Sequence, residues 1–257
     1  MKQEAMEIVN QVQLAPQIFE LTLTGELVKE MQQPGQFLHI KVPREDLILR
    51  RPISIHEILK ERDECKLIYR IEGQGTNVLS TLKKGQLIDV LGPLGNGFQI
   101  SQVGQGQTVL LIGGGIGIPP LYELSKQLVL RGAKVSHLFG FASKEKLYSL
   151  PKFEALGPVT VTTDDGSYGK LGTVATQFST YTVPDAVYSC GNKGLLQSVD
   201  RQFAPIVENV QLSLEARMAC GIGACYACIC HKKNNTAETV KVCQDGPVFQ
   251  AREVLLQ

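Results

Sequence analysis

The fold is decided by residues 108–120, which read TVLLIGGGIGIPP. A continuous apolar run opens this segment, as expected for a strand buried on both faces of a sheet. A glycine-rich turn follows, and a helical stretch over residues 119–130 comes next. Proline is well tolerated in the first turn of a helix, so the two prolines fit a helix start. The segment therefore predicts one strand–turn–helix unit of a parallel sheet.

Three further apolar runs repeat this pattern downstream. They cover residues 134–141, 159–163 and 186–190. Strands that alternate with helices predict an α/β fold with a doubly wound parallel sheet. We therefore expect a nucleotide-binding domain of this class over residues 102–209.

The segments on either side differ in character. Residues 1–101 hold short β-branched or alternating runs separated by turn residues, which predict a small antiparallel β-barrel. The last segment, 210–257, is loop-rich and holds most of the cysteines. The chain is thus expected to be multidomain, with a barrel over 1–101, the α/β domain over 102–209 and a small cysteine-rich domain over 210–257.

The glycine turn is the first candidate binding site. Glycine lets the backbone approach a pyrophosphate, and the dipole of the following helix favours its negative charge. The spacing departs from the G-x-G-x-x-G fingerprint, and a bare strand-to-helix turn is the alternative. The predicted nucleotide-binding residues of this turn are Gly113, Gly114, Gly115, Gly117 and Pro119.

Two other strand ends are expected to face the same crevice, because ligands bind outside the carboxyl ends of parallel strands. Asp164 follows one strand, although an ordinary turn aspartate is the alternative. Cys190 and Gly191 follow another strand. The functional interpretation places Cys190 beside a nicotinamide ring, as the catalytic candidate. The alternative is a buried thiol that packs before a turn.

The barrel carries a candidate flavin site. Arg51 suits a diphosphate because its planar fork donates two parallel hydrogen bonds and keeps its charge. A second phosphate-type turn lies at residues 73–76, before a helix expected to begin near residue 77. Two such sites fit FAD, and an exposed arginine pair beside an edge proline is the alternative. The predicted flavin-binding residues are Arg51, Pro52, Ile53, Ser54, Ile68, Tyr69, Arg70, Gly75 and Thr76.

Four cysteines form the most specific motif, spaced C-x4-C-x2-C-x14-C: Cys220, Cys225, Cys228 and Cys243. This is the plant-type spacing of thiolates that hold a [2Fe–2S] cluster. Structural zinc is one alternative, although zinc sites usually pair short cysteine hairpins or use histidines. Disulfides are another, and the odd total of seven cysteines argues against them. Cys230 is expected to be a small filler residue that points away from the cluster.

Composition limits the partners. The net charge is +1, so nothing argues for nucleic acid or an anionic membrane surface. No stretch approaches the ~18–20 apolar residues of a membrane span. The polar N-terminus is not expected to be a signal peptide. Thiolate-based metal chemistry without an export signal indicates the cytoplasm.

Together these motifs resemble a known family. Arg51-x-x-Ser54, the glycine loop and the Cys190-Gly191 corner, in this order, are similar to the ferredoxin–NADP reductase superfamily. Residues 215–228 and 242–249 narrow the resemblance to the electron-transfer subunits of NAD-dependent (type B) dihydroorotate dehydrogenases. Ile53 stands where many members of the wider superfamily carry a tyrosine, and no C-terminal aromatic follows. What shields the flavin ring is therefore open.

The resemblance implies a function and a partner. An FMN-containing catalytic subunit would oxidise dihydroorotate, and this chain would pass the electrons through a [2Fe–2S] cluster and FAD to NAD+ in pyrimidine (UMP) biosynthesis. Two copies of each subunit would form a heterotetramer.

Other interpretations remain open from the residues alone. One is an NAD(P)H-dependent flavin and iron–sulfur reductase subunit serving an oxygenase, a sulfide dehydrogenase or a hydrogenase. Another is a redox or zinc-binding regulatory module. Ser143, Lys144 and Lys146 suit a 2′-phosphate, so only the resemblance favours NAD over NADP.

Overall fold

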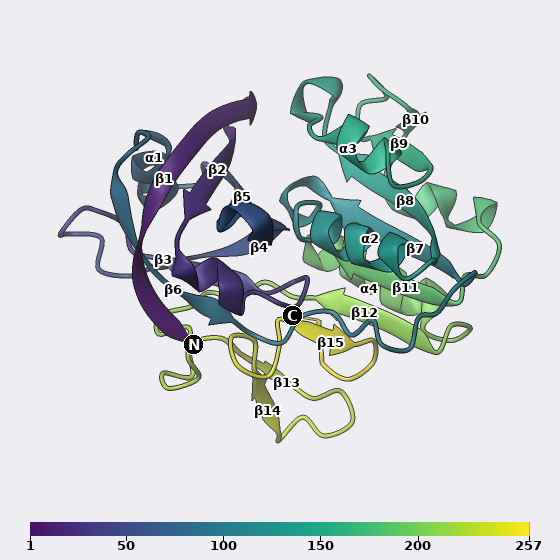
Figure 1. Cartoon of the computed structure of the whole chain (residues 1–257). Coiled ribbons are helices and arrows are strands. Elements are labelled where there is room, and N and C mark those ends of the chain that lie inside the picture. The colour runs from purple at the N-terminus through teal and green to yellow at the C-terminus, as the bar shows by residue number, and fades with distance from the viewer. Residues whose placement is uncertain (257) are drawn as a thin grey trace.

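Six antiparallel strands of the N-terminal part close into a barrel in the computed structural model, which describes residues 1–256 (Figure 1). Their order around the barrel is β1-β2-β5-β4-β3-β6. The strands are β1 (Lys2–Ala15), β2 (Ile18–Thr24), β3 (Phe37–Ile40), β4 (Arg51–Leu59), β5 (Glu64–Arg70) and β6 (Leu87–Leu94). Helix α1 (Gln74–Ser80) and the short 3₁₀ helices η1 (Glu26–Glu30) and η2 (Lys60–Arg62) lie between strands. The predicted barrel is confirmed.

A seven-stranded sheet forms the second part, in the order β10-β9-β8-β7-β11-β12-β15. Its strands are β7 (Thr108–Gly114), β8 (Lys134–Phe141), β9 (Val159–Thr163), β10 (Lys170–Leu171), β11 (Ala186–Cys190), β12 (Asn209–Ser213) and β15 (Val248–Gln250). All neighbours are parallel except β15, which runs antiparallel to β12. The α/β sheet predicted from the apolar runs is confirmed.

Helices cover both faces of this sheet. The side chains of α2 (Pro120–Leu130) and α3 (Leu150–Glu154) join one apolar core, and those of α4 (Lys193–Phe203) and the 3₁₀ helix η5 (Val174–Thr180) join another. Two further 3₁₀ turns are η3 (Gly115–Gly117) and η4 (Lys144–Lys146). None of the helices over residues 1–256 has the length and apolar character needed to cross a membrane.

The sheet has a switch point between β7 and β11. From β7 the chain moves outward through β8, β9 and β10, and it then returns to β11 and β12 on the other side of β7. The carboxyl ends of β7 and β11 therefore lie side by side, with Gly113 paired with Cys190. In open α/β sheets ligands bind at this place.

The C-terminal segment joins both larger parts. Its hairpin, β13 (Ile229–His231) and β14 (Thr239–Lys241), lies below the barrel and the sheet in Figure 1, whereas β15 extends the sheet itself. The amide of Asn96, after the barrel, donates to the carbonyls of Gln244 at 3.0 Å and Asp245 at 3.1 Å. The division at residues 101 and 209 stays a prediction, and β12 and β15 carry residues from beyond 209 into the sheet.

Buried charges tie the barrel to the α/β part. Glu57 on β4 lies 3.5 Å from the Lys126 ammonium of α2 and 3.3 Å from that of Lys152 on α3. Lys152 also lies 3.5 Å from Glu20 on β2. Lys66 on β5 lies 3.3 Å from Glu20 and 3.8 Å from Glu57, and Lys126 lies 3.2 Å from Glu123. Because Glu20, Glu57 and Glu123 are all buried, each depends on these lysines for compensation of its charge.

We expect Glu57→Gln to destabilise this junction by about 1–3 kcal/mol, because it removes the partner carboxylate of the half-buried lysines Lys126 and Lys152. Their partial exposure to solvent keeps the expected cost below that of a fully buried pair. Burial alone would raise the pKa of Glu57, but Lys152, Lys126 and Lys66 lower it below its ordinary value of 4.5. A lowered folded-state pKa gives stability that is present above the unfolded-state pKa and lost as pH falls through the folded-state pKa.

Urea unfolding of wild type and Glu57→Gln at pH 7 and pH 3.5 measures this effect. The gap between the two proteins should narrow at the lower pH, where the carboxylate takes up protons. The exposed Glu61→Gln, on the adjacent turn, is the matched control and should stay near wild type at both pH values. A gap that is equally wide at both pH values would show that the charge of Glu57 is not what holds the junction.

Candidate functional site

A cavity of about 650 Å³ lies between the barrel and the segment that follows β12. Every residue predicted to bind a flavin lines it: Arg51, Pro52, Ile53, Ser54, Ile68, Tyr69, Arg70, Gly75 and Thr76. They come from the adjacent strands β4 and β5 and from the start of α1. One wall of the cavity is thus built from three separate segments of the chain, which the fold brings together. We call this space the flavin cavity.

Arg51 and Gly75 depend on each other within this wall. A Cβ atom on Gly75 would lie only 2.4 Å from Nε of Arg51 and 2.6 Å from its Nη2. The guanidinium therefore lies directly against the backbone at the start of α1, and Nη1 donates to the carbonyl of Leu49. A fixed guanidinium beside a glycine turn is suited to hold a diphosphate.

The opposite wall was not predicted. It consists of Cys190, of Ser213 at the end of β12, and of the residues that follow this strand, namely Leu214, Glu215, Ala216, Arg217 and Met218. None of these residues is aromatic. This segment directly precedes the cysteine motif, and no local sequence pattern indicates that it also faces a cavity beside the barrel.

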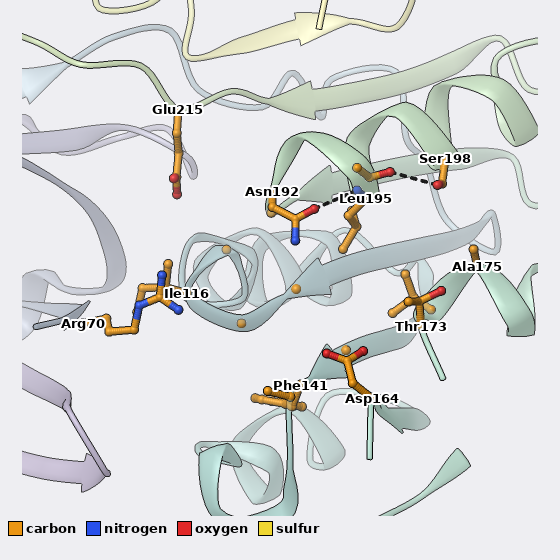
Figure 2. Close-up of a pocket in the computed structure, with 18 residues that line it drawn as sticks. Arg70, Ile116, Phe141, Asp164, Thr173, Ala175, Asn192, Leu195, Ser198 and Glu215 are labelled. Atoms are coloured by element: carbon orange, nitrogen blue, oxygen red, sulfur yellow. Dashed lines mark hydrogen bonds between the residues drawn. The ribbon is translucent and has the colours of Figure 1, made fainter. Parts of the chain in front are cut away.

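A second cavity, of about 550 Å³, lies at the switch point of the sheet (Figure 2). We call it the nucleotide cavity. Among the predicted residues, those that line it are Gly114, Gly115, Gly117, Asp164 and Gly191. Gly113 and Pro119 are not among the lining residues. A Cβ on Gly113 would lie 2.8 Å from Ile118, and the Pro119 carbonyl lies 2.9 Å from Nδ1 of His56.

Asp164 and Asp165 differ in what they contact. Asp165 accepts hydrogen bonds from the Ser167 amide at 3.0 Å and the Ser167 hydroxyl at 2.6 Å, so it serves the turn. Asp164 lines the nucleotide cavity and lies beside Thr173 at its far end in Figure 2. Ser143, Lys144 and Lys146 are not among the lining residues.

The glycine loop packs tightly against the Cys190–Gly191 corner. A Cβ on Gly117 would lie 2.5 Å from three backbone atoms there, the carbonyl carbon and oxygen of Cys190 and the nitrogen of Gly191. Gly115 adopts a left-handed conformation, with φ of 52°, and its carbonyl accepts a 2.7 Å hydrogen bond from the buried Tyr148 hydroxyl. The Cys190–Gly191 backbone and the Tyr148 hydroxyl therefore fix the conformation of the loop, and its glycine backbone faces the cavity.

The two cavities meet. Arg70, Ile116 and Glu215 line both of them, and Figure 2 shows these three residues grouped at one end of the nucleotide cavity. At the same boundary Cys190 lines the flavin cavity, and the next residue, Gly191, lines the nucleotide cavity. A ligand ring in each cavity would therefore meet the other near Ile116.

Burial raises the pKa values of two titratable groups at this boundary, Cys190 and Glu215. Burial and the charge of Glu215 raise the pKa of Cys190 to about 12, so its thiol keeps its proton at neutral pH. A protonated thiol is neither a base nor a strong nucleophile, which leaves orientation and packing as its contribution. Burial, reinforced by the charge of Glu72, raises the pKa of Glu215 above its ordinary value despite the opposing Arg70.

The motif cysteines gather in two pairs. The amides of Ile222 and Cys225 each lie 3.4 Å from the Cys220 sulfur, and the amide of Cys243 lies 3.4 Å from the Cys228 sulfur. Gly223 donates to the Cys243 sulfur at 3.2 Å. Over residues 1–256 no three His, Cys, Asp or Glu side chains converge tightly enough to hold a single metal ion. Two cysteine pairs suit a [2Fe–2S] cluster, in which each iron takes two protein ligands.

Backbone N–H groups favour the thiolate form of Cys220, whereas burial raises the pKa of Cys243 to about 12. Burial acts to raise the pKa of Cys220, but donation from Ile222, Cys225 and Ala224 and from the Cys225 thiol lowers it to about 6. A thiolate is the form that binds iron. Cys225 is exposed and Cys228 and Cys243 are buried, so the site has one side open to solvent. Cys230 is also buried and lies in β13 opposite Val240.

Comparison with family models agrees with these sites. Residues 6–98 match the model described as "Oxidoreductase FAD-binding domain". Residues 215–255 match "Iron-sulfur cluster binding domain of dihydroorotate dehydrogenase B". The first match covers the barrel with most of the flavin cavity, and the second covers all four motif cysteines.

Solved structures show the same architecture. A chain of the NADH-dependent reduced ferredoxin–NADP oxidoreductase superposes with a TM-score of 0.86 at 28% identity, over 98% of this chain and 90% of that one. The ferredoxin reductase of carbazole 1,9a-dioxygenase superposes with a TM-score of 0.69 over 82% of this chain and 68% of that one. At 16% identity, that likeness shows the fold alone.

Curated relatives align over almost the full length. Proteins named "Dihydroorotate dehydrogenase B (NAD(+)), electron transfer subunit" are 59% identical in Enterococcus faecalis, 50% in Streptococcus thermophilus and 46% in Bacillus cereus. These alignments cover at least 98% of both chains in each case. The chain belongs to the family of dihydroorotate dehydrogenase B (NAD(+)) electron transfer subunits.

Proposed function

We propose that this chain is an electron-transfer subunit that carries electrons from a catalytic dihydroorotate dehydrogenase subunit to NAD+ in pyrimidine biosynthesis. The observation that carries this proposal is the continuity of three sites. The flavin cavity shares Arg70, Ile116 and Glu215 with the nucleotide cavity. On its other side, Phe37 lines the flavin cavity and belongs to the same apolar cluster as the ligands Cys228 and Cys243.

The residues fit FAD, NAD+ and a [2Fe–2S] cluster, each in one site. Arg51 and the Gly75 turn would hold the FAD diphosphate, and the Gly115–Gly117 loop would hold that of NAD+. FAD, when bound, exchanges single electrons with an iron–sulfur cluster and a hydride with nicotinamide. The chain supplies orientation, because Ile116 and the Cys190–Gly191 corner fix where the two cavities meet.

The catalytic partner would dock where the cluster comes closest to the surface. Around the exposed ligand Cys225 the chain presents the apolar side chains of Ile222, Tyr226 and Ile229, which are 43%, 61% and 40% exposed. Tyr226 has a left-handed backbone, with φ of 58°, and its ring lies 4.1 Å from the Lys241 ammonium. Exposed apolar and aromatic groups mark interaction surfaces. We propose that the partner carries FMN and forms a heterotetramer with two copies of this chain.

The test is dihydroorotate-dependent reduction of NAD+ by the chain purified with its co-produced catalytic partner. NADH should form with the complex and not with this chain alone. If flavin and cluster are both present but no NADH forms, the chain instead serves another flavin and iron–sulfur reductase system, delivering electrons from NAD(P)H to an oxygenase, a sulfide dehydrogenase or a hydrogenase.

Asp164 is expected to select NAD+ over NADP+. A carboxylate at a strand end can accept a hydrogen bond from the ribose 2′-hydroxyl and repels a 2′-phosphate. Asp164→Asn should therefore raise the NADP+ to NAD+ ratio of kcat/KM at least about tenfold. Asp165→Asn, whose side chain serves the turn, is the matched control and should keep the wild-type ratio. An unchanged ratio in Asp164→Asn would assign discrimination to other residues.

A further inference from the structure

His39 has an unexplained buried side chain. It is fully buried on β3, and over residues 1–256 neither ring nitrogen has a hydrogen-bond partner of good geometry, although backbone groups of Cys220 and Arg50 lie near the ring. A buried polar group without a partner is costly and is rare in folded proteins. The cavity residues and cluster ligands described above do not account for it, so a missing partner is the first explanation to examine.

The ring lies between the barrel and the cysteine loop. Gly221, directly after the ligand Cys220, has φ of 72°, and a Cβ there would lie 2.5 Å from Nδ1 of His39. Only glycine leaves room for the ring at this point. The imidazole therefore contacts the backbone of the loop that wraps the cluster, although the two segments are far apart in the chain.

The same face of β3 also reaches the flavin. Side chains two residues apart point to the same side of a strand. Phe37 lines the flavin cavity, so the face that presents Phe37 to the flavin presents His39 to the cluster loop. The alternate residues, Leu38 and Ile40, belong to the barrel core. His39 also pairs with Pro52, the neighbour of Arg51. It thus stands between the two predicted redox groups.

The chemistry of the ring fits a donor. An imidazole carries an N–H donor whether it is neutral or protonated. The sulfur atoms of an iron–sulfur cluster accept such hydrogen bonds, and these bonds tune its reduction potential.

We propose that His39 donates its ring N–H to a sulfur atom of the bound [2Fe–2S] cluster and thereby raises the potential at which this chain accepts electrons. The reduced cluster carries one more negative charge than the oxidised cluster, so an N–H donor stabilises the reduced form more. This proposal rests on the proposed function, since it requires that the cysteines hold this cluster. His39 would contact the cluster through this hydrogen bond alone and is not a ligand of its irons.

The experiment is a redox titration of the complete complex, followed by the EPR signal of the reduced cluster, in wild type, His39→Leu and His39→Gln. His39→Leu keeps a side chain of similar bulk without a donor and should disfavour cluster reduction about tenfold, or 59 mV for a one-electron couple. His39→Gln restores an N–H and should lie closer to wild type. If His39→Leu instead left a packing defect that admits water, the potential should rise, because water stabilises the negative charge of the reduced cluster.

A second measurement keeps the test decisive if His39→Leu assembles no cluster. Pulsed EPR of the reduced complex labelled with ¹⁵N-histidine should show a nitrogen coupled to the cluster. The coupling should persist in His231→Gln, which removes the half-buried histidine of β13. An unshifted potential in His39→Leu, or no coupled nitrogen, would overturn the role of His39 while the cluster stands. No EPR signal in wild type would instead remove the proposed function.

Discussion

Cys225→Ser should abolish electron flow from dihydroorotate to NAD+ while the chain still oxidises NADH. Cys225 is the exposed member of the Cys220–Cys225 pair, and a serine hydroxyl does not ionise to replace a thiolate at neutral pH. Loss of a partner outside the ligand shell already costs ~10–100-fold, so loss of a ligand should cost at least about 100-fold. NADH oxidation by an artificial two-electron acceptor should stay near wild type, because Cys225 lines neither cavity.

The two activities are measured on the same preparation, together with iron and FAD content. Cys230→Ala is the matched control, since it removes a neighbouring thiol that lies in β13 and is absent from the two cysteine pairs. It should retain both activities and its iron. If Cys225→Ser lost NADH oxidation with its FAD still bound, the order of carriers proposed for this chain would be wrong.

Gly117→Ala should strongly slow the reaction with NAD+. The new Cβ would lie 2.5 Å from backbone atoms of Cys190 and Gly191, and backbone atoms cannot rotate aside as a flexible side chain does. The glycine loop and the corner must therefore separate. Because a displacement near 1 Å in a reacting pair costs about 100-fold, kcat/KM for NAD+ should fall by that order.

Gly194→Ala is the control for this change. Gly194 also lines the nucleotide cavity, but its nearest neighbour to a new Cβ is the Asn192 side-chain oxygen at 3.5 Å, an ordinary contact. Alanine in place of a helical glycine should stabilise the chain by about 0.5–1 kcal/mol with NADH oxidation retained. Steady-state kinetics and FAD content of both variants decide the matter. Equal kinetics in the two variants would show that the loop-to-corner contact tolerates expansion.

Much of the fold could be predicted because its information is local. The strands expected at residues 134–141, 159–163 and 186–190 are β8, β9 and β11 with the same bounds. Apolar periodicity depends on near neighbours, so it survives in a single sequence. The glycine turn after β7 and the cysteine spacing are local too, and both predicted the class of ligand that their sites would hold.

Only one wall of the flavin cavity could be predicted from the sequence. Arg51, Ser54 and Gly75 were identified because each belongs to a short motif, and the structure gathers them in the flavin cavity. Glu215 and Met218, on the opposite wall, belong to the segment that resembles the cluster motif and were not predicted to face the flavin. No local pattern indicates that a segment after β12 faces the barrel.

The barrel, the doubly wound sheet, the glycine loop and the four-cysteine motif could thus be identified before the structure, because each depends on residues close in the chain. The structure was needed to show that the two cavities share Arg70 and Glu215, that β15 extends the sheet, and that His39 contacts Gly221. The physical reason is that these contacts join residues far apart in the chain. Their positions are set by how the barrel, sheet and cysteine loop pack together, and no periodicity or spacing records that packing.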